Sequence, residues 1–379
     1  MFQTGGRMLV PFYSNTQEMR SLTPDLRREF ALLVEQDTLV NGPMVKRFEK
    51  ELSDYTGAKY VIATSNASDA LELVLRSLGI GPGDEVIVPC YSFFSSVSCI
   101  RKVGATPVFV DIDAPTYALN LLAVEAAITR DTKAIMVVHL FCQMADMQAL
   151  NEVATRHQVL IVEDSAEAIG MTQNGVHAGR FGSAGVLSFF PTKTLGALGD
   201  AGAIITDDPK LAVAMRQTGD LGRDGSGLAV RRGICSRMDD WHAIVLSHRL
   251  RTLQANIERR QEVAARYSRL LGQVPDVQLP RLTAYVKSGE EVFYVYLIEV
   301  EQRDELAKFL LAQGIVTETY YPMPLHLQPA MSDLGYRVGC FPVAETAASK
   351  ALALPIHPEI QKAQIEYTVE AIATFYSSR

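Results

Sequence analysis

One lysine, Lys193, lies in the stretch SFFPTKTLGALGDAGA (residues 188–203), among mainly small, aromatic and glycine residues. An amine held in a tight apolar turn is a candidate nucleophile, because loss of solvation disfavours the ammonium form and exposes the nitrogen lone pair. A loop lysine whose side chain reaches out to solvent fits the same segment equally well. The segment alone therefore leaves a reactive lysine and an ordinary surface lysine open.

Four further residues lie within or just after predicted strands and could complete a site around this lysine. Ser68 opens a predicted helix, where free N–H groups and the helix dipole bind anions. Phe93 offers a flat ring, Asp164 ends a strand with a carboxylate, and Ser188 belongs to the strand that leads into Lys193. In a parallel α/β sheet, ligands bind beyond the carboxyl ends of the strands. A phosphate cradle, an aromatic plate, an acid and an amine together predict a pyridoxal phosphate site.

In such a site Lys193 forms the Schiff base, and Asp164 pairs with the pyridinium nitrogen so that the ring can act as an electron sink. Taken singly, these residues also have ordinary explanations. Asp164 could be a turn residue at a strand end, Phe93 part of the core, and Ser68 a plain helix cap. Their expected co-location on one sheet edge is what favours the cofactor site.

The elements that must position these residues alternate along the chain from residue 60. Apolar stretches are near-continuous, as expected of strands buried on both faces of a mainly parallel sheet. Stretches with helical periodicity, such as SDALELVLRSLG, separate them. This alternation predicts an α/β layered domain. The predicted strands span 60–65, 85–91, 106–112, 134–141, 159–165, 184–190 and 202–208.

Beyond residue 238 the pattern changes to mainly helices. Residues 239–271 contain neither Gly nor Pro and predict one long helix. The remaining predicted elements are a strand over 291–300 and helices over 303–314, 345–354 and 361–378. We expect a large α/β domain over residues 1–250 and a smaller α+β domain over residues 251–379.

The composition favours a cytoplasmic enzyme or binding protein. The net charge is −7 with both signs mixed, so no basic face for nucleic acid is expected. The longest apolar runs are too short to span a bilayer, and the N-terminus has no apolar core of signal-peptide length. The five cysteines are scattered, so neither a disulfide framework nor a metal site is predicted.

Ordered blocks over nearly the whole chain resemble the DegT/DnrJ/EryC1/StrS sugar aminotransferases, a family of fold-type I pyridoxal phosphate enzymes. The blocks are NGPMVKRFEKELSDYTGAKYVIATSNASDALELVL, GPGDEVIVPCYSFFSS, GATPVFVDID, VEDSAEAIG, SFFPTKTLGALGDAGAIIT, SRMDDWHA and YYPMPLHLQPAM. So many blocks in the family order make the resemblance far more specific than one short motif. It implies a large domain with a mostly parallel central sheet flanked by helices, and a smaller C-terminal α+β domain.

The resemblance also implies roles for individual residues. Lys193 matches the lysine that holds the cofactor and acts as acid and base, and Asp164 matches the partner of the ring nitrogen. Phe93 matches the position that stacks on the ring, and Glu167 the position beside the ring oxygen. Phosphate contacts are implied for Ala67 (through its backbone amide), Ser68 and Ser188.

Family members are usually homodimers whose active sites borrow residues from the neighbouring subunit. The block GICSRMDD would supply them, but Cys235 stands where the family commonly has an Asn that helps to hold the cofactor phosphate. A thiol is a weak donor, so Ser236 and Arg237 are alternative donors for this contact. Cys142 and Met144 replace a frequent Gly and a frequent Pro near the expected substrate mouth, which indicates an altered substrate or a repacked loop.

The reaction that the resemblance implies is transfer of an amino group from L-glutamate to a nucleotide-linked keto-sugar. Blocks similar to enzymes acting at C-3 and at C-4 both occur, so a dTDP-linked 3-keto or 4-keto deoxyhexose fits, and an aminocyclitol ketone is an alternative. Tyr321 and His326 lie in the block that closes over the pocket in family members. Arg237, Arg231, Arg232 and His326 are candidate partners for the carboxylates or the diphosphate, although Arg231 and Arg232 fit ordinary surface charges better.

Two rival activities stay open. Some family members dehydrate a sugar, and in one such group histidine replaces the lysine, so Lys193 favours amino transfer. A catalytically silent relative could instead serve as a binding or regulatory subunit, but the intact pair of Lys193 and Asp164 argues against it. His139, at the end of a strand, is expected to be a satisfied core histidine rather than a pocket donor.

Overall fold

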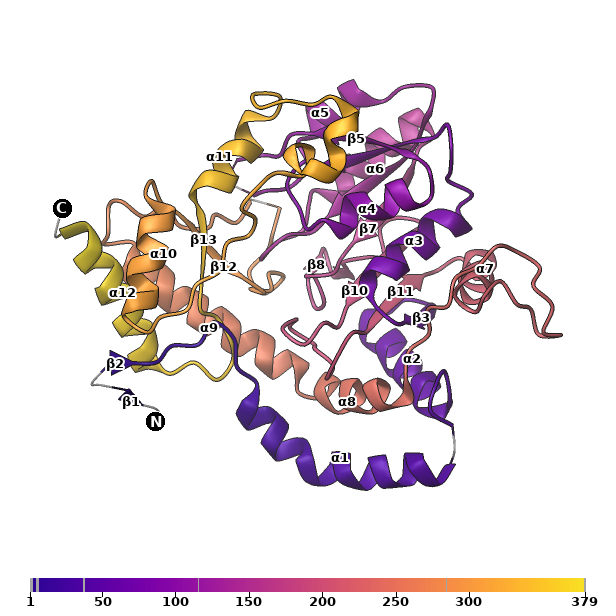
Figure 1. The fold of residues 1–379 in the computed structure, drawn as a ribbon, viewed down its shortest axis with the longest axis horizontal. Helices are drawn as coiled ribbons and strands as arrows, with labels where there is room; N and C mark the ends of the chain where they lie inside the picture. Colours follow the sequence, from indigo (N-terminus) through magenta and orange to yellow (C-terminus); the bar gives the residue numbers. More distant parts are fainter. Residues whose placement is uncertain (1–2, 5–6, 37, 115, 284, 378–379) are drawn as a thin grey trace.

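The computed structural model describes residues 3–4, 7–36, 38–114, 116–283 and 285–377 (Figure 1). Its centre is a seven-stranded sheet with the strand order β3-β11-β10-β7-β6-β4-β5. The strands are β3 (Tyr60–Thr64), β4 (Glu85–Pro89), β5 (Thr106–Val110), β6 (Thr132–Val138), β7 (Leu160–Asp164), β10 (Ala184–Ser188) and β11 (Gly202–Thr206). Neighbouring strands from β10 to β5 are parallel, whereas β11 is antiparallel to both β10 and β3. The predicted mostly parallel central sheet is confirmed.

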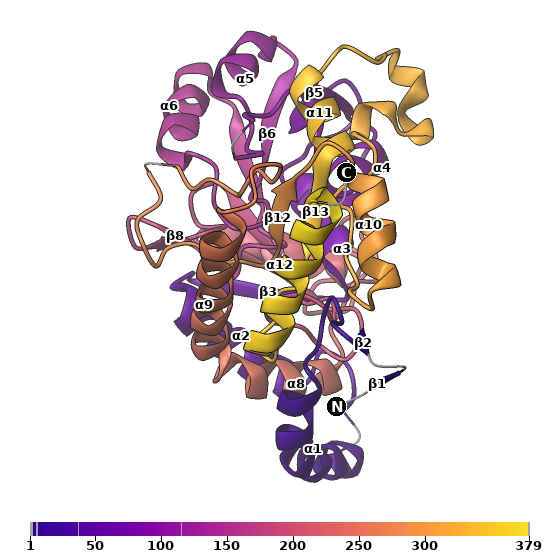
Figure 2. The same ribbon diagram turned by 90° about the vertical axis from the view of Figure 1, so that its left-hand side faces the viewer.

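Helices pack on both faces of this sheet, which is why its strands are near-continuous apolar runs (Figures 1 and 2). Strand β4 shows both faces: Val86 and Val88 join a core with α3, α4 and α7, whereas Ile87 joins a core with α2, α6 and α8. The helices of this part are α2 (Pro43–Thr56), α3 (Ala67–Ser77), α4 (Ser95–Lys102), α5 (Leu121–Ala127), α6 (Met147–His157), α7 (Pro209–Gly219) and α8 (Asp240–Leu250). The α/β layered architecture is therefore confirmed.

The C-terminal elements surround a two-stranded antiparallel sheet of β12 and β13. A third hydrophobic core, which includes Tyr267, Tyr296, Leu310 and Ile372, holds them together. The elements are α9 (Leu253–Leu271), β12 (Tyr296–Glu299), α10 (Arg303–Ala312), the 3₁₀ turns η1 (Leu325–Leu327) and η2 (Pro329–Leu334), α11 (Pro342–Lys350), β13 (Ala351–Leu354) and α12 (Lys362–Ser377). The predicted domain boundary between residues 250 and 251 falls between α8 and α9, and the division into two domains stays a prediction.

Helix α1 extends along the outside of the molecule beside α8 (Figures 1 and 2). Its Phe30 ring meets the ring of Trp241 edge-on, with the centroids 5.1 Å apart. The remaining short elements are β1 (Gln3–Thr4), β2 (Arg7–Met8), α1 itself (Thr16–Gln36), β8 (Thr172–Gln173) and β9 (Val176–His177).

The single helix predicted over residues 239–271 is wrong, because the chain forms α8 and α9 with a turn between them. At this turn the Thr252 amide donates to the Arg249 carbonyl at 3.2 Å, three residues back. The Thr252 hydroxyl donates to the same carbonyl at 3.1 Å and also reaches a carboxylate oxygen of Glu18 at 3.0 Å. A side-chain hydroxyl that competes for backbone groups breaks the α-helical bond pattern here.

Two other predicted elements differ from the structure. The strand expected over 291–300 begins only at Tyr296, because the amides of Val292 and Tyr294 donate to the carbonyls of Cys142 and Phe141. The helix expected over 345–354 instead starts earlier and ends at Lys350. Its last four expected residues form β13, which pairs with β12.

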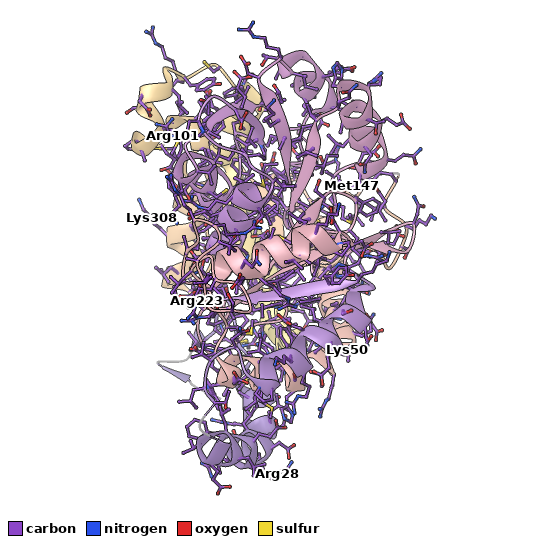
Figure 3. All side chains as sticks on the ribbon, turned by 90° about the vertical axis from the view of Figure 1, so that its right-hand side faces the viewer. Arg28, Lys50, Arg101, Met147, Arg223 and Lys308 are labelled. Carbon is purple, nitrogen blue, oxygen red and sulfur yellow. The ribbon has the colours of Figure 1, made fainter. Side chains whose placement is uncertain are left out.

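Charged side chains project from the surface in Figure 3, which labels Arg28 on α1 and Lys50 on α2 among others. Each of these two has a carboxylate neighbour on its own helix, Asp25 and Asp54 respectively. Exposed pairs of this kind contribute little to stability. Within the described ranges, no helix has both the length and the apolar character that crossing a membrane requires.

Candidate functional site

A cavity of about 490 Å³ lies at the carboxyl edge of the sheet, where ends of its strands meet Tyr294, Tyr320 and Tyr321 of the C-terminal part. Most of the residues that the sequence analysis singled out line this one cavity. They are Ala67, Ser68, Phe93, Asp164, Glu167, Ser188, Lys193 and Tyr321. The structure thus brings together the amine, the acid, the ring and the helix N-terminus, whereas their individual roles stay predictions.

Lys193 sits in the loop between β10 and β11, where its amide closes a turn onto the Phe190 carbonyl at 2.8 Å. Its Nζ lies 3.2 Å from Oε1 of Glu167 and 4.1 Å from the centroid of the Tyr294 ring. Burial lowers the pKa of Lys193, but Glu167, Tyr294 and Asp164 outweigh it, so the pKa is raised overall. The sequence-based idea that desolvation alone frees the lone pair is therefore wrong for this arrangement, in which the neighbours favour the ammonium.

Asp164 ends β7 and is only 4% exposed. Its Oδ2 accepts a hydrogen bond from the Ser96 hydroxyl at 2.7 Å, and its Oδ1 accepts one from the Ala166 amide at 3.3 Å. Burial, above all, raises the pKa of this carboxyl, against the lowering by these two bonds and by Lys193. A buried carboxylate in this state favours a cationic partner in the cavity, because a positive charge would offset its desolvation.

Two helix N-termini meet at another side of the cavity. Asn66 caps α3, where its side chain accepts from the Asp69 amide, and the hydroxyls of Ser68 and Ser95 lie 2.6 Å apart. Ser95 is itself the first residue of α4. An ideal Cβ placed on Gly202 would lie 2.7 Å from the Ala67 amide nitrogen, so only glycine lets β11 approach this close. Backbone amides gathered around hydroxyls in this way suit an anion.

Glu167 links the two halves of the site. Its Oε2 accepts from the Phe141 amide at 3.0 Å, while its Oε1 faces both the Lys193 amine and the Tyr321 hydroxyl, the latter at 3.4 Å. The C-terminal residue Tyr321 and the sheet-borne Lys193 thus share one carboxylate oxygen.

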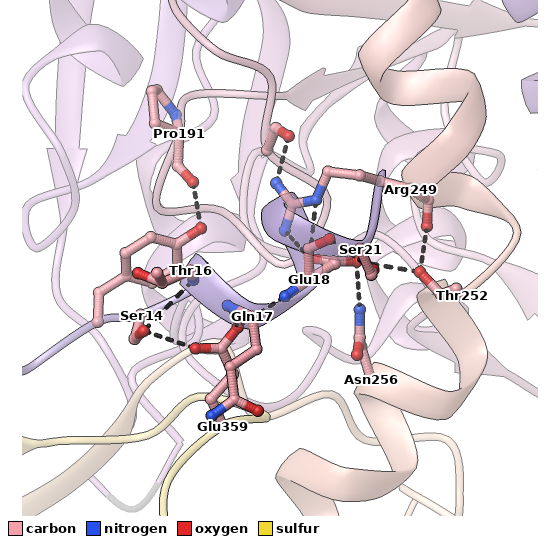
Figure 4. Close-up of polar contacts among 12 residues, drawn as sticks. Ser14, Thr16, Gln17, Glu18, Ser21, Pro191, Arg249, Thr252, Asn256 and Glu359 are labelled. Atoms are coloured by element: carbon pink, nitrogen blue, oxygen red, sulfur yellow. Dashed lines mark hydrogen bonds and ion pairs between the residues drawn. The ribbon is translucent and has the colours of Figure 1, made fainter. Parts of the chain in front are cut away.

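A polar network anchors the loop between β10 and β11 that carries Lys193, called the lysine loop below (Figure 4). Tyr13 donates to the Pro191 carbonyl at 2.6 Å, and Arg249 donates to the Gly196 carbonyl. Arg249 also pairs with Glu18 at 2.9 Å. The first turn of α1 is held in turn by Glu359, which accepts from the amides of Gln17 and Glu18 and from the Ser14 hydroxyl. The chain is therefore anchored on both sides of Lys193, at Pro191 by the N-terminal segment and at Gly196 by α8.

Several predicted residues do not line this cavity: Cys142, Met144, Arg231, Arg232, Cys235, Ser236, Arg237 and His326. Cys235 is exposed and accepts from Arg237 at 3.1 Å, and Arg237 also pairs with Asp220. His326 is buried beside Glu345, with its Nε2 3.2 Å from the carboxylate. Cys142 and Met144, which replace a frequent Gly and a frequent Pro of the family, are both buried in hydrophobic cores.

His139 fits the expected core histidine, although it also borders the cavity. Its Nε2 lies 3.0 Å from Glu163, and its Nδ1 accepts from the Ala145 amide at 3.2 Å. Because Nδ1 accepts a hydrogen bond, Nε2 is the ring nitrogen that donates to Glu163.

Several residues of the site escaped the sequence analysis. Ser96 bonds to Asp164 from one turn of α4, and the SFFSS stretch after a strand could have indicated it as a helix start. Tyr294 falls within the strand predicted over 291–300, a context that gives no sign of a site residue. Tyr13 and Arg249 reach the lysine loop across long sequence separations, which no local pattern records.

The model of the DegT/DnrJ/EryC1/StrS aminotransferase family matches residues 21–373. A pleiotropic regulatory protein of Geobacillus stearothermophilus is 42% identical over 97% of this chain and 99% of its own. The dTDP-3-amino-3,4,6-trideoxy-alpha-D-glucose transaminase of Streptomyces venezuelae is 38% identical, over 96% and 95%. The UDP-2-acetamido-2-deoxy-3-oxo-D-glucuronate aminotransferase of Pseudomonas aeruginosa is 37% identical, over 87% and 90%.

Two solved structures also match nearly the whole chain. S. venezuelae DesV, crystallised with a ketimine intermediate, superposes with a TM-score of 0.93 at 36% identity, over 97% of this chain and 98% of its own. NtdA of Bacillus subtilis, with bound cofactor PMP, superposes with a TM-score of 0.88 at 29% identity, over 100% of this chain and 87% of its own.

Proposed function

The chain belongs to the DegT/DnrJ/EryC1/StrS aminotransferase family, and on that premise we propose that this sugar aminotransferase transfers the amino group of L-glutamate to a nucleotide-linked 3-keto-sugar with pyridoxal phosphate as cofactor. The observation that carries the proposal is the meeting of Lys193 and Asp164 at one cavity.

The residues of the cavity fit pyridoxal phosphate. The aldehyde suits the Lys193 amine, and a protonated ring nitrogen would supply the positive charge that the buried Asp164 carboxylate favours. The phosphate suits the amides and hydroxyls at the N-terminus of α3, together with Ser188. Phe93 is 59% exposed at the cavity, so its ring face is free to stack. When bound, this cofactor supplies an electron sink for the carbanion next to the amino group.

The protein's own residues then hold and move the proton. Lys193 Nζ would hold the proton that leaves the amino donor, as the family resemblance implies, and Glu167 orients that amine through their 3.2 Å contact. The Phe141 amide fixes the other Glu167 oxygen, so this orienting carboxylate is itself held in place. Tyr321, from the C-terminal part, lines the cavity beside the pair, with its hydroxyl 3.4 Å from Glu167 Oε1.

The position of the keto group rests on the relatives. Two of them carry names that place the amino or oxo group at position 3, one on a dTDP sugar and one on a UDP sugar. These names support the C-3 alternative of the sequence analysis over C-4, and they support a dTDP- or UDP-linked sugar as the proposed substrate. L-glutamate as donor rests on the family resemblance.

We further propose a homodimer with shared active sites. Among the described residues that line the cavity, Lys193 is the sole lysine or arginine. The diphosphate of a nucleotide sugar and the two carboxylates of glutamate need several cations or hydrogen-bond donors. Phe93 and Phe190 at the lining are 59% and 47% exposed, and Leu198 of the same loop is 45% exposed. An apolar rim around a cavity short of cations supports a neighbouring subunit that covers the rim and adds the missing donors.

The test is to supply the purified enzyme with glutamate and, in turn, a 3-keto and a 4-keto nucleotide sugar and an aminocyclitol ketone. A new amino-sugar from the 3-keto substrate alone is the expected result. Ammonia without an amino-sugar would mean dehydration, and a colourless protein that cannot be reconstituted with the cofactor would mean a silent relative. Either outcome contradicts the proposal, as does a preference for the 4-keto sugar or the cyclitol.

A further inference from the structure

Tyr294 contacts the Lys193 amine, a contact for which the chemistry above has no role. Lys193 Nζ lies 4.1 Å from the centroid of the Tyr294 ring, within the range of a cation–π interaction. The tyrosine is only 7% exposed, and such interactions are strongest where water is excluded. The amine therefore sits between a ring on one side and the Glu167 carboxylate on another.

Hydrogen bonds hold the Tyr294 backbone at both its amide and its carbonyl. Its amide donates to the Phe141 carbonyl at 3.0 Å, and its carbonyl accepts from Arg260 Nη1 at 3.3 Å. Arg260 is 2% exposed, and the same Nη1 donates to the carbonyls of Phe293 and Ile356 at 3.2 and 2.9 Å. A buried guanidinium thus clamps this segment to α9.

The ring itself is held at its hydroxyl. The Tyr294 oxygen lies 3.5 Å from the Thr192 hydroxyl, next to Lys193 in the chain, and 3.4 Å from the Tyr320 hydroxyl. The Tyr294 and Tyr320 rings meet edge-on with an interplanar angle of 87°. The face that Tyr294 presents to the amine is therefore set before any ligand binds.

We propose that Tyr294 is a positioning residue that holds the Lys193 ammonium against Glu167 whenever the amine is not bonded to cofactor or substrate. A free lysine side chain has many rotamers, and confining it keeps Nζ where it must receive and return a proton. The inference rests on the proposed role of Lys193. It adds that the C-terminal part of the chain contributes to proton transfer through an aromatic face.

The ring favours the ammonium form, so its loss makes the neutral amine more abundant. Tyr294→Leu removes the face, whereas Tyr294→Phe keeps it and loses only the hydroxyl. The readout is covalent capture of pyridoxal phosphate by cofactor-free protein, followed by absorbance across pH. In this reaction the neutral amine attacks the aldehyde carbon and water leaves. Lys193→Ala gives the background from other lysines.

We expect Tyr294→Leu to shift the pH profile of capture to lower pH, with capture at neutral pH roughly 2- to 30-fold faster than in the wild type. Tyr294→Phe should stay within about 2-fold of the wild type. Phe293→Leu is the matched control, because it removes the neighbouring ring, which packs on Tyr296 in another core. Its profile should not move. If Tyr294→Leu fails to fold, Tyr294→Met makes the same comparison.

Coincident profiles for the wild type and Tyr294→Leu would overturn the inference. An equal shift in Phe293→Leu would also overturn it, since the cause would then be general loosening. If the wild type captured no more pyridoxal phosphate than Lys193→Ala, the proposed function of the site would be overturned. Capture by Lys193 that does not change in Tyr294→Leu would overturn only the role of Tyr294.

Discussion

Glu167 Oε1 lies 3.2 Å from Lys193 Nζ, and the two side chains are only 5% and 15% exposed. Burial by itself would lower the pKa of Lys193, but the carboxylate outweighs that effect together with Tyr294 and Asp164. The amine is thus kept as an ammonium, whose proton must leave before the nitrogen can attack an aldehyde. The pair therefore sets the pH at which the site accepts a cofactor.

Glu167→Gln should shift cofactor capture to lower pH. The carboxylate raises the pKa of Lys193 against burial, so its loss lowers that pKa relative to the wild type and the neutral amine forms at lower pH. We expect capture of pyridoxal phosphate at neutral pH to become roughly tenfold faster, measured by absorbance on cofactor-free protein. Glu262→Gln, at an exposed pair on α9, should change nothing. A profile that moves to higher pH would refute this account of the pair.

Lys193→Arg should abolish both covalent capture and amino transfer while leaving the fold intact. The guanidinium keeps the positive charge beside Glu167, but it stays protonated at any accessible pH and offers no lone pair. Thermal melting should stay close to that of the wild type. The measurements are cofactor absorbance and product formation, and residual turnover above background would contradict the assignment of Lys193.

Most of the sheet and the lysine side of the site could be predicted because both depend on short-range patterns. The strands of the central sheet are mainly apolar runs, and Asp164 and Lys193 follow from strand ends that must share an edge. The division of residues 239–271 into two helices could not be predicted. It depends on Thr252 meeting Glu18, a residue more than two hundred positions earlier.

The same limit applies to the missed residues of the site. Tyr294 has the sequence context of a strand, and its ring is placed beside the amine by backbone bonds to Phe141 and Arg260, which are distant in the sequence. Arg249 lies in an ordinary helical pattern, and its partner Gly196 has no signal of its own. Tertiary contacts, not local preference, decide such positions.

Gly202→Ala should weaken cofactor binding through the backbone. The new Cβ would lie 2.7 Å from the Ala67 amide nitrogen and 2.7 Å from the Asn66 carbonyl carbon, so the N-terminus of α3 must shift. We expect about a tenfold loss of affinity for pyridoxal phosphate, measured by titration, because small displacements of a binding group cost this much. Gly225→Ala, whose added Cβ meets open space, is the matched control. Equal affinities in the two variants would show that the cradle is not the phosphate site.

Arg249→Met should destabilise the fold and loosen the lysine loop together. The guanidinium is 4% exposed, pairs with Glu18 and holds the Gly196 carbonyl. Its removal leaves a largely buried carboxylate without its cation, which costs about 3 kcal/mol of unfolding free energy. Urea denaturation measures this loss, and hydrogen exchange over residues 191–196 should accelerate. Arg28→Met, at an exposed pair, should cost less than about 0.5 kcal/mol. Unchanged hydrogen exchange over residues 191–196 would show that Arg249 does not hold the loop that carries Lys193.

Asp164→Asn should stabilise the cofactor-free protein at neutral pH while weakening cofactor binding. Burial, chiefly, raises the pKa of Asp164 in the folded chain, so between the unfolded and folded pKa values the folded state binds more protons. Stability of the wild type therefore falls as pH rises through that window, and the loss persists above it. The amide carries no charge, so the variant should gain roughly 1 kcal/mol at neutral pH and nothing in acid.

The measurement is urea denaturation of both cofactor-free proteins at acidic and neutral pH, with Asp25→Asn, at an exposed pair on α1, as the control. A cationic ring nitrogen would offset the desolvated carboxylate, so added pyridoxal phosphate should stabilise the wild type more than Asp164→Asn. A variant that is less stable than the wild type at neutral pH, yet binds the cofactor equally well, would mean that Asp164 serves the fold and not the ring.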